Sequence, residues 1–401
     1  MKYNLSDICD YVKGKIDVAV LDQDTYISTE NMIPNKGGIT RAASLPTVAQ
    51  TQSFSAGDVL VSNIRPYFKK IWFAEYDGGC SNDVLVFRAK EGVSKRFLYY
   101  VLADDTFFDY SMATSKGTKM PRGDKTAIMK YEVPDFTYEK QEKIAGILEV
   151  LDRKIQLNTE INENLLQQAQ AILSAFFIDF SRFGGKVPSD WEQGSLQDIA
   201  DFSNGYAFKS KELLDAPTPD CYHVFKQGHI NRGGGFNSSG TKSWYPISKC
   251  SSLSKYVLRK GDILMAMTDM KDNVAILGNT ALMTVDNQYI VNQRVGLLRS
   301  NGYRSTSYAY IYLLTNSFDF LKDLRSRANS GVQVNLSSAE IKASSVWIAT
   351  DEVNREFNSL TEPLLAMIMA NDIENIKMAN IRDALLPQLM SGELDVSDIE
   401  L

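Results

Sequence analysis

The sequence has little of the chemistry that most enzymes and metal sites need. It contains two histidines in 401 residues, so acid–base or nucleophilic catalysis by histidine has few candidates. No G-x-G-x-x-G segment follows an apolar strand, so the sequence shows no motif that would bind a nucleotide cofactor. The four cysteines form no CxxC pair, and we interpret them as reduced thiols of a cytoplasmic protein.

Long apolar runs are also lacking, and we expect no secretory leader. No stretch approaches the 18 apolar residues that predict a membrane-spanning helix, so we expect no membrane partner. A length of 401 residues predicts two to three domains, and 44% apolar with 23% charged residues fits a globular protein. The net charge of −6 argues weakly against nucleic-acid binding, although the charge on one face decides that question.

Two local patterns resemble ligand sites but lack the required spacing. Asp135 is followed by Glu139 and Lys140, which are adjacent and so cannot share the metal-facing side of one strand as in a nuclease site. A second set lacks the close ligand pairs of structural zinc sites; it comprises Cys221, His223, His229 and Cys250. We therefore expect no catalytic residue, no metal site and no cofactor bound by this chain.

The longest regular feature is the segment 137–180. It contains no Gly or Pro except Gly146, and its apolar residues recur at spacings of three and four, which predicts one long helix. At roughly 1.5 Å per residue this helix would be about 65 Å long, too long to bury its apolar stripe in one small domain. We therefore expect a coiled-coil arm, with Asn158 and Asn162 near the seam, where polar side chains fix the register.

A second segment, 351–392, offers a partner helix. Pro363 is expected to start or kink this helix, because proline is tolerated only in the first turn, and Pro387 and Gly392 are expected to close it. The expected stripe comprises Phe357, Leu360, Leu364, Ile368, Asp372, Ile376, Ala379 and Leu386.

The two halves of the chain repeat the same short motifs in the same order. Residues 5–14 and 196–205 share the pattern L-x-D-I-x-D-aromatic-x-x-G. Gly-Asp-Val-Leu at 57–60 then matches Gly-Asp-Ile-Leu at 261–264, and the aromatic segment starting at Phe97 resembles the one starting at Tyr308. The difference in numbering grows along the chain, as expected for a duplicated domain whose loops have lengthened.

The halves are expected to mix short strands with aromatic-rich helices. Helices are expected at 97–110 and 308–326, and a loop at 115–130 carries five cations and one acid. The Gly-Asp elements predict a turn followed by a strand. The expected strands are 59–62, 71–74, 84–87 and 131–134 in the first half, and 257–267, 275–277 and 290–298 in the second.

Loops of both halves interleave basic and polar side chains with aromatic ones. Lys and Arg neutralise phosphates, and Arg, Asn and Gln make paired hydrogen bonds to base edges. Two similar domains with such loops, held apart by a rigid helix pair, would read two separated DNA sites. The candidate DNA-binding residues are Arg65, Tyr67, Lys69, Lys70, Lys116, Thr118, Lys119, Arg122, Lys209, Lys211, Asn231, Arg232, Lys271, Asn273, Arg294, Gln333 and Asn335.

Taken together, these features resemble the specificity (S) subunit of a type I restriction–modification system over essentially the whole chain. The resemblance rests on the duplicated start, the G-D-[VI]-L elements, and three arm segments at 140–145, 171–180 and 385–394. It implies two target-recognition domains, each reading half of a split double-stranded DNA sequence. It also implies helical arms that dock two methyltransferase subunits, joined by a motor-nuclease restriction subunit.

The resemblance assigns the small molecules to other subunits. S-adenosylmethionine, ATP and Mg would be bound by the partners and none by this chain. The second copy departs from the pattern, because Asn354-Arg355-Glu356 replaces the entry that contains Gln141, and Pro363 falls where the first copy has Glu149. A shorter or kinked second arm is therefore expected.

The sequence thus predicts an α+β protein with two mixed α/β target-recognition domains, separated by two long antiparallel helices that form a coiled-coil spacer, and a pseudo-two-fold duplication. The expected ranges are 1–136 and 195–350 for the recognition domains, 137–180 and 351–392 for the helices, 181–194 for a linker and 393–401 for an acidic tail. Expected partner-docking residues are Ile144, Leu151, Ile155, Ile161, Leu165, Ile172, Phe176, Leu364, Ile368, Ile376 and Leu386.

The predicted function is that of a non-catalytic, cytoplasmic DNA-specificity subunit. Two other classes stay open at this point. One is a nuclease or methyltransferase whose motifs have diverged beyond recognition, and the other is a purely structural coiled-coil scaffold without a nucleic-acid role.

Overall fold

The computed structural model describes residues 3–270, 274–330 and 333–396. The chain divides into two compact units, which we name unit 1 (Met1–Ile155 with Lys377–Leu401) and unit 2 (Gln156–Ile376). Each unit combines one globular half of the sequence with one end of each long helix. Both units mix helices with strands, so the predicted α+β class is confirmed.

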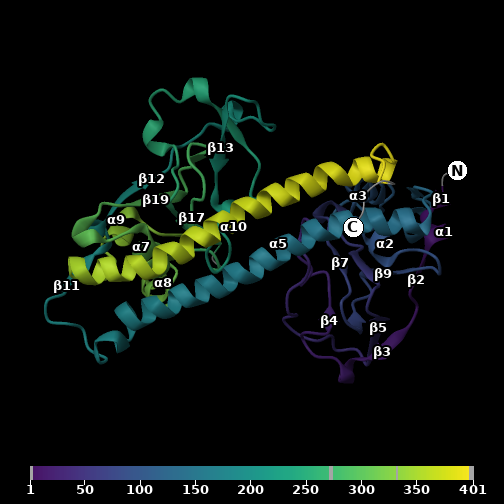
Figure 1. The fold of residues 1–401 in the computed structure, drawn as a ribbon, viewed down its shortest axis with the longest axis horizontal. Helices are drawn as coiled ribbons and strands as arrows, with labels where there is room; N and C mark the ends of the chain where they lie inside the picture. The colour runs from purple at the N-terminus through teal and green to yellow at the C-terminus, as the bar shows by residue number, and fades with distance from the viewer. Residues whose placement is uncertain (1–2, 271–273, 331–332, 397–401) are drawn as a thin grey trace. The chain divides into compact units, whose positions relative to one another are not determined.

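The centre of unit 1 is a four-stranded antiparallel sheet (Figure 1). Strand β6 (Val59–Ser62) matches the predicted range 59–62. Strand β7 (Ile71–Phe73) ends one residue before the predicted end at 74, and β9 (Val84–Ala89) extends the predicted strand 84–87 by two residues. The strand order is β2 (Cys9–Tyr11), β9 (Val84–Ala89), β6 (Val59–Ser62) and β7 (Ile71–Phe73).

Alternate residues of this sheet face two different cores, as the period of two along a strand requires. Val59 and Phe87 pack with helices α2 (Lys95–Ala103) and α3 (Asp105–Ala113). Leu60 and Val86 face the opposite core. The sheet therefore separates a helical layer from a second layer, which contains a sheet of order β3 (Lys15–Asp17), β5 (Gln50–Phe54), β8 (Gly78–Cys80) and β4 (Tyr26–Ile27).

Unit 2 repeats the central sheet and its helices. Helices α7 (Tyr308–Thr315) and α8 (Phe318–Ser326) correspond to α2 and α3. The shared motifs thus mark one architecture used twice. The strand order is β12 (Ala200–Asn204), β19 (Val295–Ser300), β15 (Ile263–Ala266) and β17 (Thr280–Leu282), equivalent to β2, β9, β6 and β7.

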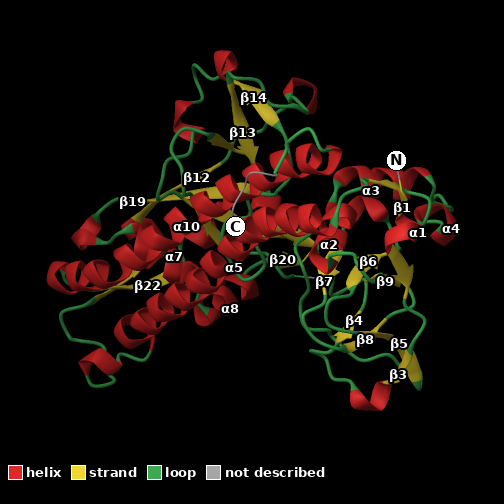
Figure 2. Ribbon diagram, turned by 45° about the vertical axis from the view of Figure 1, so that its right-hand side comes forward, coloured by secondary structure: helices red, strands yellow, loops and turns green. Residues whose placement is uncertain are grey.

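The outer layer of unit 2 differs from that of unit 1. A sheet of β14 (Trp244–Pro246), β13 (Cys221–Phe225) and β18 (Tyr289–Val291) extends away from β12 and β19 (Figure 2). A further small sheet contains β16 (Thr268–Met270), β21 (Gln333–Asn335) and β20 (Asn329–Ser330). The remaining elements are α1 (Leu5–Ile8), α4 (Lys125–Ile128), the pair β1 (Tyr3–Asn4) with β10 (Glu132–Val133), α6 (Leu196–Ile199), α9 (Ser338–Lys342), and the pair β11 (Glu192–Ser195) with β22 (Ser345–Ile348).

Several predicted boundaries were wrong. Each aromatic-rich helix is two helices, because Asp104 and Ser317 have extended backbones and start a new helix. The apolar periodicity hides these breaks, since both helices of each pair bury side chains in one core. In the second half, 257–262 and 275–277 are not strands, and β18 and β19 replace the single strand expected at 290–298.

The duplicated start of each half is explained by helix capping. In the first copy the Asp7 carboxylate accepts the backbone N–H of Asn4 at 2.8 Å, and in the second Asp198 accepts the N–H of Ser195 at 2.8 Å. Both are capping boxes at the start of a four-residue helix. Asp7 and Asp198 of this motif therefore specify local structure.

The Gly-Asp elements are explained in the same way. Gly57 has a φ of 91° and Gly261 a φ of 88°, a region that glycine adopts without strain. Asp58 is buried and accepts two hydrogen bonds of 2.7 Å from Arg88. Asp262 makes the same paired contact with Arg299, at 2.7 and 2.8 Å. Each element joins its turn to the neighbouring strand through a bidentate ion pair.

The long helices are the most extended elements of the chain. Helix α5 spans Tyr138–Leu173 and continues into a π-helical turn at Ser174–Ile178, so the predicted long helix is confirmed over most of its length. Its 36 residues correspond to about 54 Å. Among the described residues, no helix combines the length and apolar character that crossing a membrane requires.

The second long helix, α10, spans Asp351–Ser391 without interruption. Pro363 does not start this helix, and Pro387 does not end it; Gly392, at a φ of 75°, follows its last residue. Pro363 and Ser359 are both exposed, so water can hydrate the carbonyl that lacks a helical donor at this proline. The predicted shortening of the second arm was therefore wrong.

Within unit 2, the buried face of α10 shares only Phe357 with the predicted stripe, whose members Leu364 and Ile368 are half-buried. Leu360 is 44% exposed. The buried residues recur at intervals of four, through Phe357, Thr361, Leu365 and Met369. The stripe includes a threonine because its hydroxyl donates to the Phe357 carbonyl at 2.8 Å, which satisfies the polar atom inside the core.

Polar side chains connect the two helices inside unit 2. Asn158, 2% exposed, donates to Glu374 at 2.7 Å and to Asn375 at 2.9 Å. Asn162 donates to Asp372 at 2.9 Å and accepts from Asn371 at 2.8 Å. As residue numbers rise on α5 they fall on α10, so the helices are antiparallel here, and the two asparagines lie at the seam as predicted.

In the second copy, an asparagine takes the place of the glutamine at the helix entry. Gln141 donates to the Phe136 carbonyl at 2.9 Å and accepts from the Ser94 N–H at 3.0 Å. Asn354 donates to the Ala349 carbonyl at 3.3 Å and to the Arg304 carbonyl at 2.7 Å. Both amides are buried and fasten the start of their helix to the globular part. The substitution thus preserves the entry.

Candidate nucleic-acid interface

Three loops of unit 1, 28–40, 63–70 and 114–124, meet beside the central sheet. The N–H groups of Asn35 and Lys36 donate to the carbonyls of Phe68 and Lys69, each at 2.8 Å. The Arg65 N–H donates to the Pro121 carbonyl at 2.8 Å. We call these segments the three-loop surface.

Ion pairs fix the cations on one side of this surface. Lys36 and Lys69 both contact the Asp105 carboxylate, at 2.9 and 2.8 Å. Burial opposes ionisation of Asp105, but the hydrogen bonds from the two lysines outweigh it and hold its pKa below the ordinary value. Lys70 donates to the Thr29 carbonyl at 2.5 Å, and its pKa is lowered because the ammonium is partly buried.

The loop 114–124 carries the most exposed cations. Lys116 pairs with Asp124 at 2.5 Å, and this hydrogen bond, with the backbone N–H groups of α4, lowers the pKa of Asp124 to about 2. Arg122 pairs with Asp83 at 3.0 Å. Lys119 is exposed and makes no ion pair within the described part of the chain. Lys119 is therefore the cation most available to a phosphate.

The three-loop surface unites all eight predicted residues of the first half: Arg65, Tyr67, Lys69, Lys70, Lys116, Thr118, Lys119 and Arg122. It also contains Lys36 and Phe68, which the sequence did not single out; the sole signal for Phe68 was its place between predicted residues. The surface has seven cations against four carboxylates, in a chain whose net charge is −6. It is a local positive field in an acidic protein.

In unit 2 the predicted residues do not form one surface. Gln333 and Asn335 are exposed on β21, which pairs with β16 directly after β15. Arg294 is also exposed. It lies near β16, because its carbonyl accepts the N–H of Met267, the residue before this strand, at 3.3 Å. These three residues form a second polar surface around β16.

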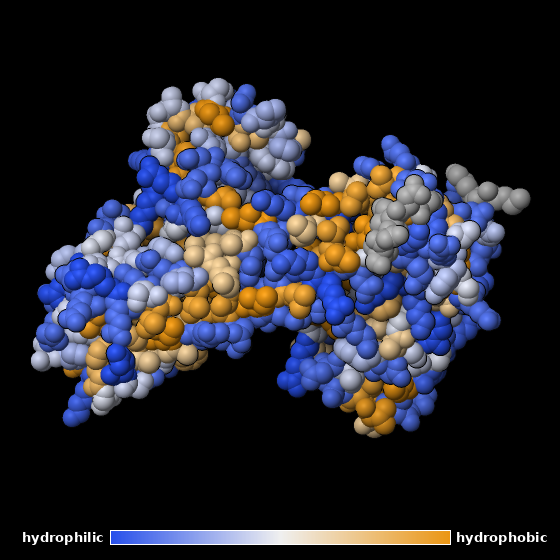
Figure 3. Space-filling model, viewed as in Figure 1, coloured by the Kyte–Doolittle hydropathy of each residue, from blue (hydrophilic) through white to orange (hydrophobic). Residues whose placement is uncertain are grey.

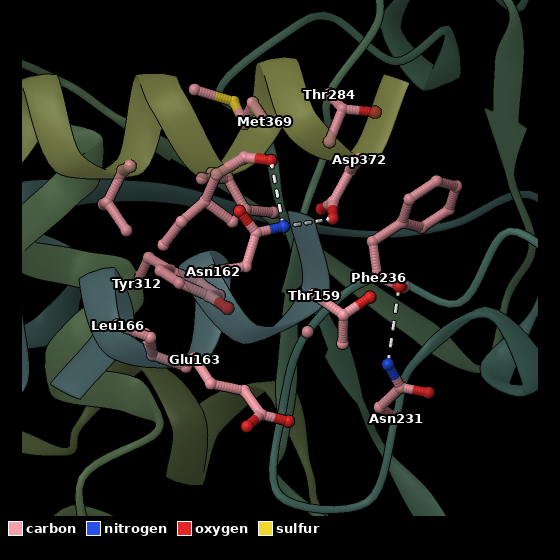
Figure 4. A pocket seen from close by; sticks show the side chains of 14 residues that line it. Thr159, Asn162, Glu163, Leu166, Asn231, Phe236, Thr284, Tyr312, Met369 and Asp372 are labelled. Atoms are coloured by element: carbon pink, nitrogen blue, oxygen red, sulfur yellow. Dashed lines mark hydrogen bonds between the residues drawn. The ribbon is translucent and has the colours of Figure 1, made fainter. Parts of the chain in front are cut away.

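Other predicted residues of unit 2 lie elsewhere. Lys209 and Lys211 are exposed at the short 3-10 turn Ser210–Glu212. Asn231 lines a pocket of about 180 Å³ with Asn162 and Asp372 of the long helices (Figure 4). Arg232 follows it in the same loop. The structure thus places Asn231 against the arms, a grouping that residue type alone could not reveal.

Two predicted residues, Lys271 and Asn273, lie outside the described residues, as does 397–401 of the acidic tail. Among the described residues, no three His, Cys, Asp or Glu side chains are grouped to hold a metal ion.

Three of the predicted partner-docking residues are buried in their own unit. Ile144 is 0%, Phe176 3% and Leu386 4% exposed, so they stabilise the cores and cannot form a docking surface. Leu151, Ile155, Leu165, Ile172, Leu364, Ile368 and Ile376 are half-buried. Of the predicted set, Ile161 alone is exposed, at 45%.

Most of the exposed apolar residues of the two long helices are not among the predicted partner-docking residues. The face drawn in Figure 3 shows apolar side chains gathered along the course of α5. Val150, Leu157 and Ile161 of α5 are 64%, 48% and 45% exposed, and their spacings of seven and four place them on one side of the helix. Leu360, Met367 and Ile381 are the exposed large apolar residues of α10. The prediction missed these residues because the apolar pattern of a helix does not show which of its apolar side chains the packed elements leave exposed.

The repeated sheets and the helix pair define a class of protein that is built from two related regions, one of which carries the basic three-loop surface. The model of the type I restriction modification DNA specificity domain matches residues 1–167 and again 188–356. The chain belongs to this family.

Individual relatives agree with the family match. The chain is 25% identical to the type I restriction enzyme HindI specificity subunit of Haemophilus influenzae, over 98% of this chain and 99% of that protein. It is 24% identical to the MjaIX specificity subunit of Methanocaldococcus jannaschii, over 77% of this chain and 71% of that protein. A crystal structure of the type I S subunit from M. genitalium has the same fold, with a TM-score of 0.57 at 16% identity, covering 99% and 96% of the two chains.

Proposed function

We propose that this chain is the DNA-specificity subunit of a type I restriction–modification complex and reads a bipartite target with one family region for each half-site. The observation that carries this proposal is the double match of the family model, at 1–167 and 188–356. Two sheets of identical strand order support it, because each repeat can then present its own reading loops.

In the first half-site, the three-loop surface would supply most phosphate contacts. Its excess of positive charge attracts the backbone, while Arg65 and Arg122 have the fork geometry that pairs with guanine. In the second half-site, Gln333, Asn335 and Arg294 around β16 would be the reading groups. Amides and guanidinium groups there offer paired hydrogen bonds to adenine and guanine edges.

The long helices would have two roles. As a rigid pair fixed in register by Asn158 and Asn162, they would act as a coiled-coil spacer that sets the gap between half-sites. The exposed apolar side of α5, with Val150, Leu157 and Ile161, would dock a methyltransferase subunit. A pseudo-two-fold arrangement of the units would then allow two such subunits to bind, and a motor-nuclease subunit would complete the complex.

Catalysis would belong to the partners. We propose that this chain is non-catalytic, that S-adenosylmethionine binds the methyltransferase subunits, and that ATP and Mg serve the motor-nuclease subunit. The purified chain alone should neither methylate nor cut DNA.

The decisive experiment is a methylation map of host DNA by single-molecule sequencing, with and without this gene. Loss of methylation at one split motif, two half-sites with a fixed gap, is expected and would also name the target. Complementation with the wild-type gene is the control. An unchanged map, together with a chain that co-purifies with no methyltransferase, would refute the proposal in favour of a structural scaffold.

A further inference from the structure

Backbone strain is concentrated in the three-loop surface. Among the described residues, eight other than glycine have a positive φ. Four of them lie in two loops that hydrogen-bond to each other: Asn35 (57°), Lys36 (61°), Arg65 (52°) and Lys69 (51°). This region of conformational space destabilises residues that carry a Cβ, and such residues cluster at binding sites.

The strained residues Arg65 and Lys69 flank a single turn, Pro66–Phe68. Pro66 is buried and fixes the first φ of the turn, and the Lys69 N–H closes it by donating to the Pro66 carbonyl at 2.8 Å. Hydrogen bonds from the N–H groups of Asn35 and Lys36 hold the turn from the facing loop. The turn is therefore a rigid support.

This support exposes two aromatic rings. Tyr67 is 49% and Phe68 37% exposed, and their ring centroids are 4.7 Å apart at an angle of 55°. Neither ring belongs to a hydrophobic core in the described part of the chain. The strained backbone thus leaves two neighbouring aromatic rings partly in water, where their exposed parts contribute no hydrophobic stabilisation to the folded chain.

Cations surround the two rings. Lys70 lies 5.9 Å from the centre of the Phe68 ring, and Lys36 and Lys69 are oriented by Asp105. The Nε atom of Arg65 is buried and has no hydrogen-bond partner within the described chain. This arrangement is complementary to DNA, because aromatic rings can stack on bases while the cations beside them contact the phosphates of the two strands.

We propose that Tyr67 and Phe68 form a wedge that enters a base step of the half-site bound by unit 1 and unstacks it, while the flanking cations hold the phosphates on either side. The proposal rests on the proposed function and deepens it. Aromatic and other apolar side chains that separate a base step kink the duplex and stack on the bases. The wedge would favour flexible pyrimidine–purine steps, and so would read sequence through deformability.

The second unit gives the proposal an internal control. After β15, the equivalent of β6, the chain continues into β16 (Thr268–Met270), which pairs with β21. No aromatic residue occurs from Met267 to Gly278. Unstacking should therefore occur in one half-site only.

The test uses the full-length chain, purified with the subunits that co-purify with it, and duplexes that carry the motif from the methylation map. The fluorescent adenine analogue 2-aminopurine, quenched when stacked, replaces in turn each adenine of both half-sites except the adenines that the map shows to be methylated, because a docked methyltransferase flips those out of the stack. We expect a several-fold rise in fluorescence on binding, at one step of one half-site. In the double variant Tyr67→Ala/Phe68→Ala the rise should disappear, and affinity should fall about 10- to 100-fold, as for lost base–aromatic stacking.

The matched control is Tyr138→Ala, which removes a 54%-exposed tyrosine of the same unit outside the three loops and should change neither readout. Tyr67→Leu/Phe68→Leu keeps apolar groups on the turn and should retain part of the fluorescence rise, even if the alanine variant folds poorly. Motif-specific binding by the wild type without a rise at any position would overturn the wedge and leave the proposed function standing. Absence of motif-specific binding by the wild-type complex would overturn both.

Discussion

The most direct test of the three-loop surface is the salt dependence of DNA binding after Lys119→Ala. Each phosphate neutralised by a cation contributes about 0.9 to the slope of log K against log salt. Because Lys119 is exposed and makes no ion pair in the described chain, its loss should remove about one unit of slope. From about 50 to 200 mM salt, one such contact changes affinity by roughly three- to fourfold. The variant should therefore differ most from the wild type at low salt.

The triple variant Lys116→Ala/Lys119→Ala/Arg122→Ala should have a larger effect. It removes up to about 2.7 units of slope if all three cations reach phosphates. It also leaves the Asp124 and Asp83 carboxylates without their partners, and these charges would then repel the DNA.

Binding is best measured by fluorescence anisotropy over a series of salt concentrations, with the purified complex and the mapped motif. Lys130→Ala is a suitable control, since Lys130 is exposed in the same unit but lies outside the three loops. An unchanged slope in the triple variant would refute the assignment of this surface to DNA, whatever the change in affinity at one salt concentration.

Three further outcomes follow from the long helices. Asn354→Ala should destabilise unit 2 by about 1–3 kcal/mol, because the buried Ala349 carbonyl and the part-buried Arg304 carbonyl lose their donor; urea unfolding measures this, and a loss below about 0.5 kcal/mol would contradict the role of the amide. Burial, partly offset by the hydrogen bond from Asn162, raises the pKa of Asp372 from 3.8 to about 6. The folded state therefore binds the Asp372 proton more tightly than the unfolded state does. The protonated carboxyl contributes fully to the free energy of unfolding below about pH 4, and this contribution is lost as the pH rises to about 6. Relative to Asp372→Asn, the wild type should lose roughly 3 kcal/mol between about pH 4 and pH 7, and parallel curves would contradict this. Leu157→Arg/Ile161→Arg should abolish co-purification of a methyltransferase while leaving the melting temperature within a few degrees, and undiminished co-purification would exclude this docking face.

The features that the sequence predicted best are those with a fixed local geometry. The capping boxes at Asp7 and Asp198 and the Gly-Asp turns require particular residues at particular positions, so both copies kept them and the duplication is visible. The long helix α5 was predictable for a similar reason, since an apolar period of three to four that continues over many residues matches the turn of an α-helix and not the alternation of a strand.

Predictions failed where a distant part of the chain determines the outcome. Pro363 normally signals the first turn of a helix, but α10 tolerates it on an exposed face where water reaches the freed carbonyl. Leu360 fits the apolar period and is nevertheless exposed, because the globular part of unit 2 covers the adjacent stripe from Phe357 to Met369. The replacement of Gln141 by Asn354 indicated a changed entry, yet the shorter amide reaches an equivalent carbonyl.

The sequence by itself determined the duplication, the mixed fold class, the two long helices and the residue types that could contact DNA, because these depend on local spacing and composition. Only the tertiary structure decided which of those residues share a surface. It joined three loops of unit 1 around a strained turn, placed Asn231 in a pocket with Asn162 and Asp372, and buried Ile144, Phe176 and Leu386. The physical reason is that a surface is made by the packing of segments far apart in the chain, whereas a motif records only the interactions of neighbours.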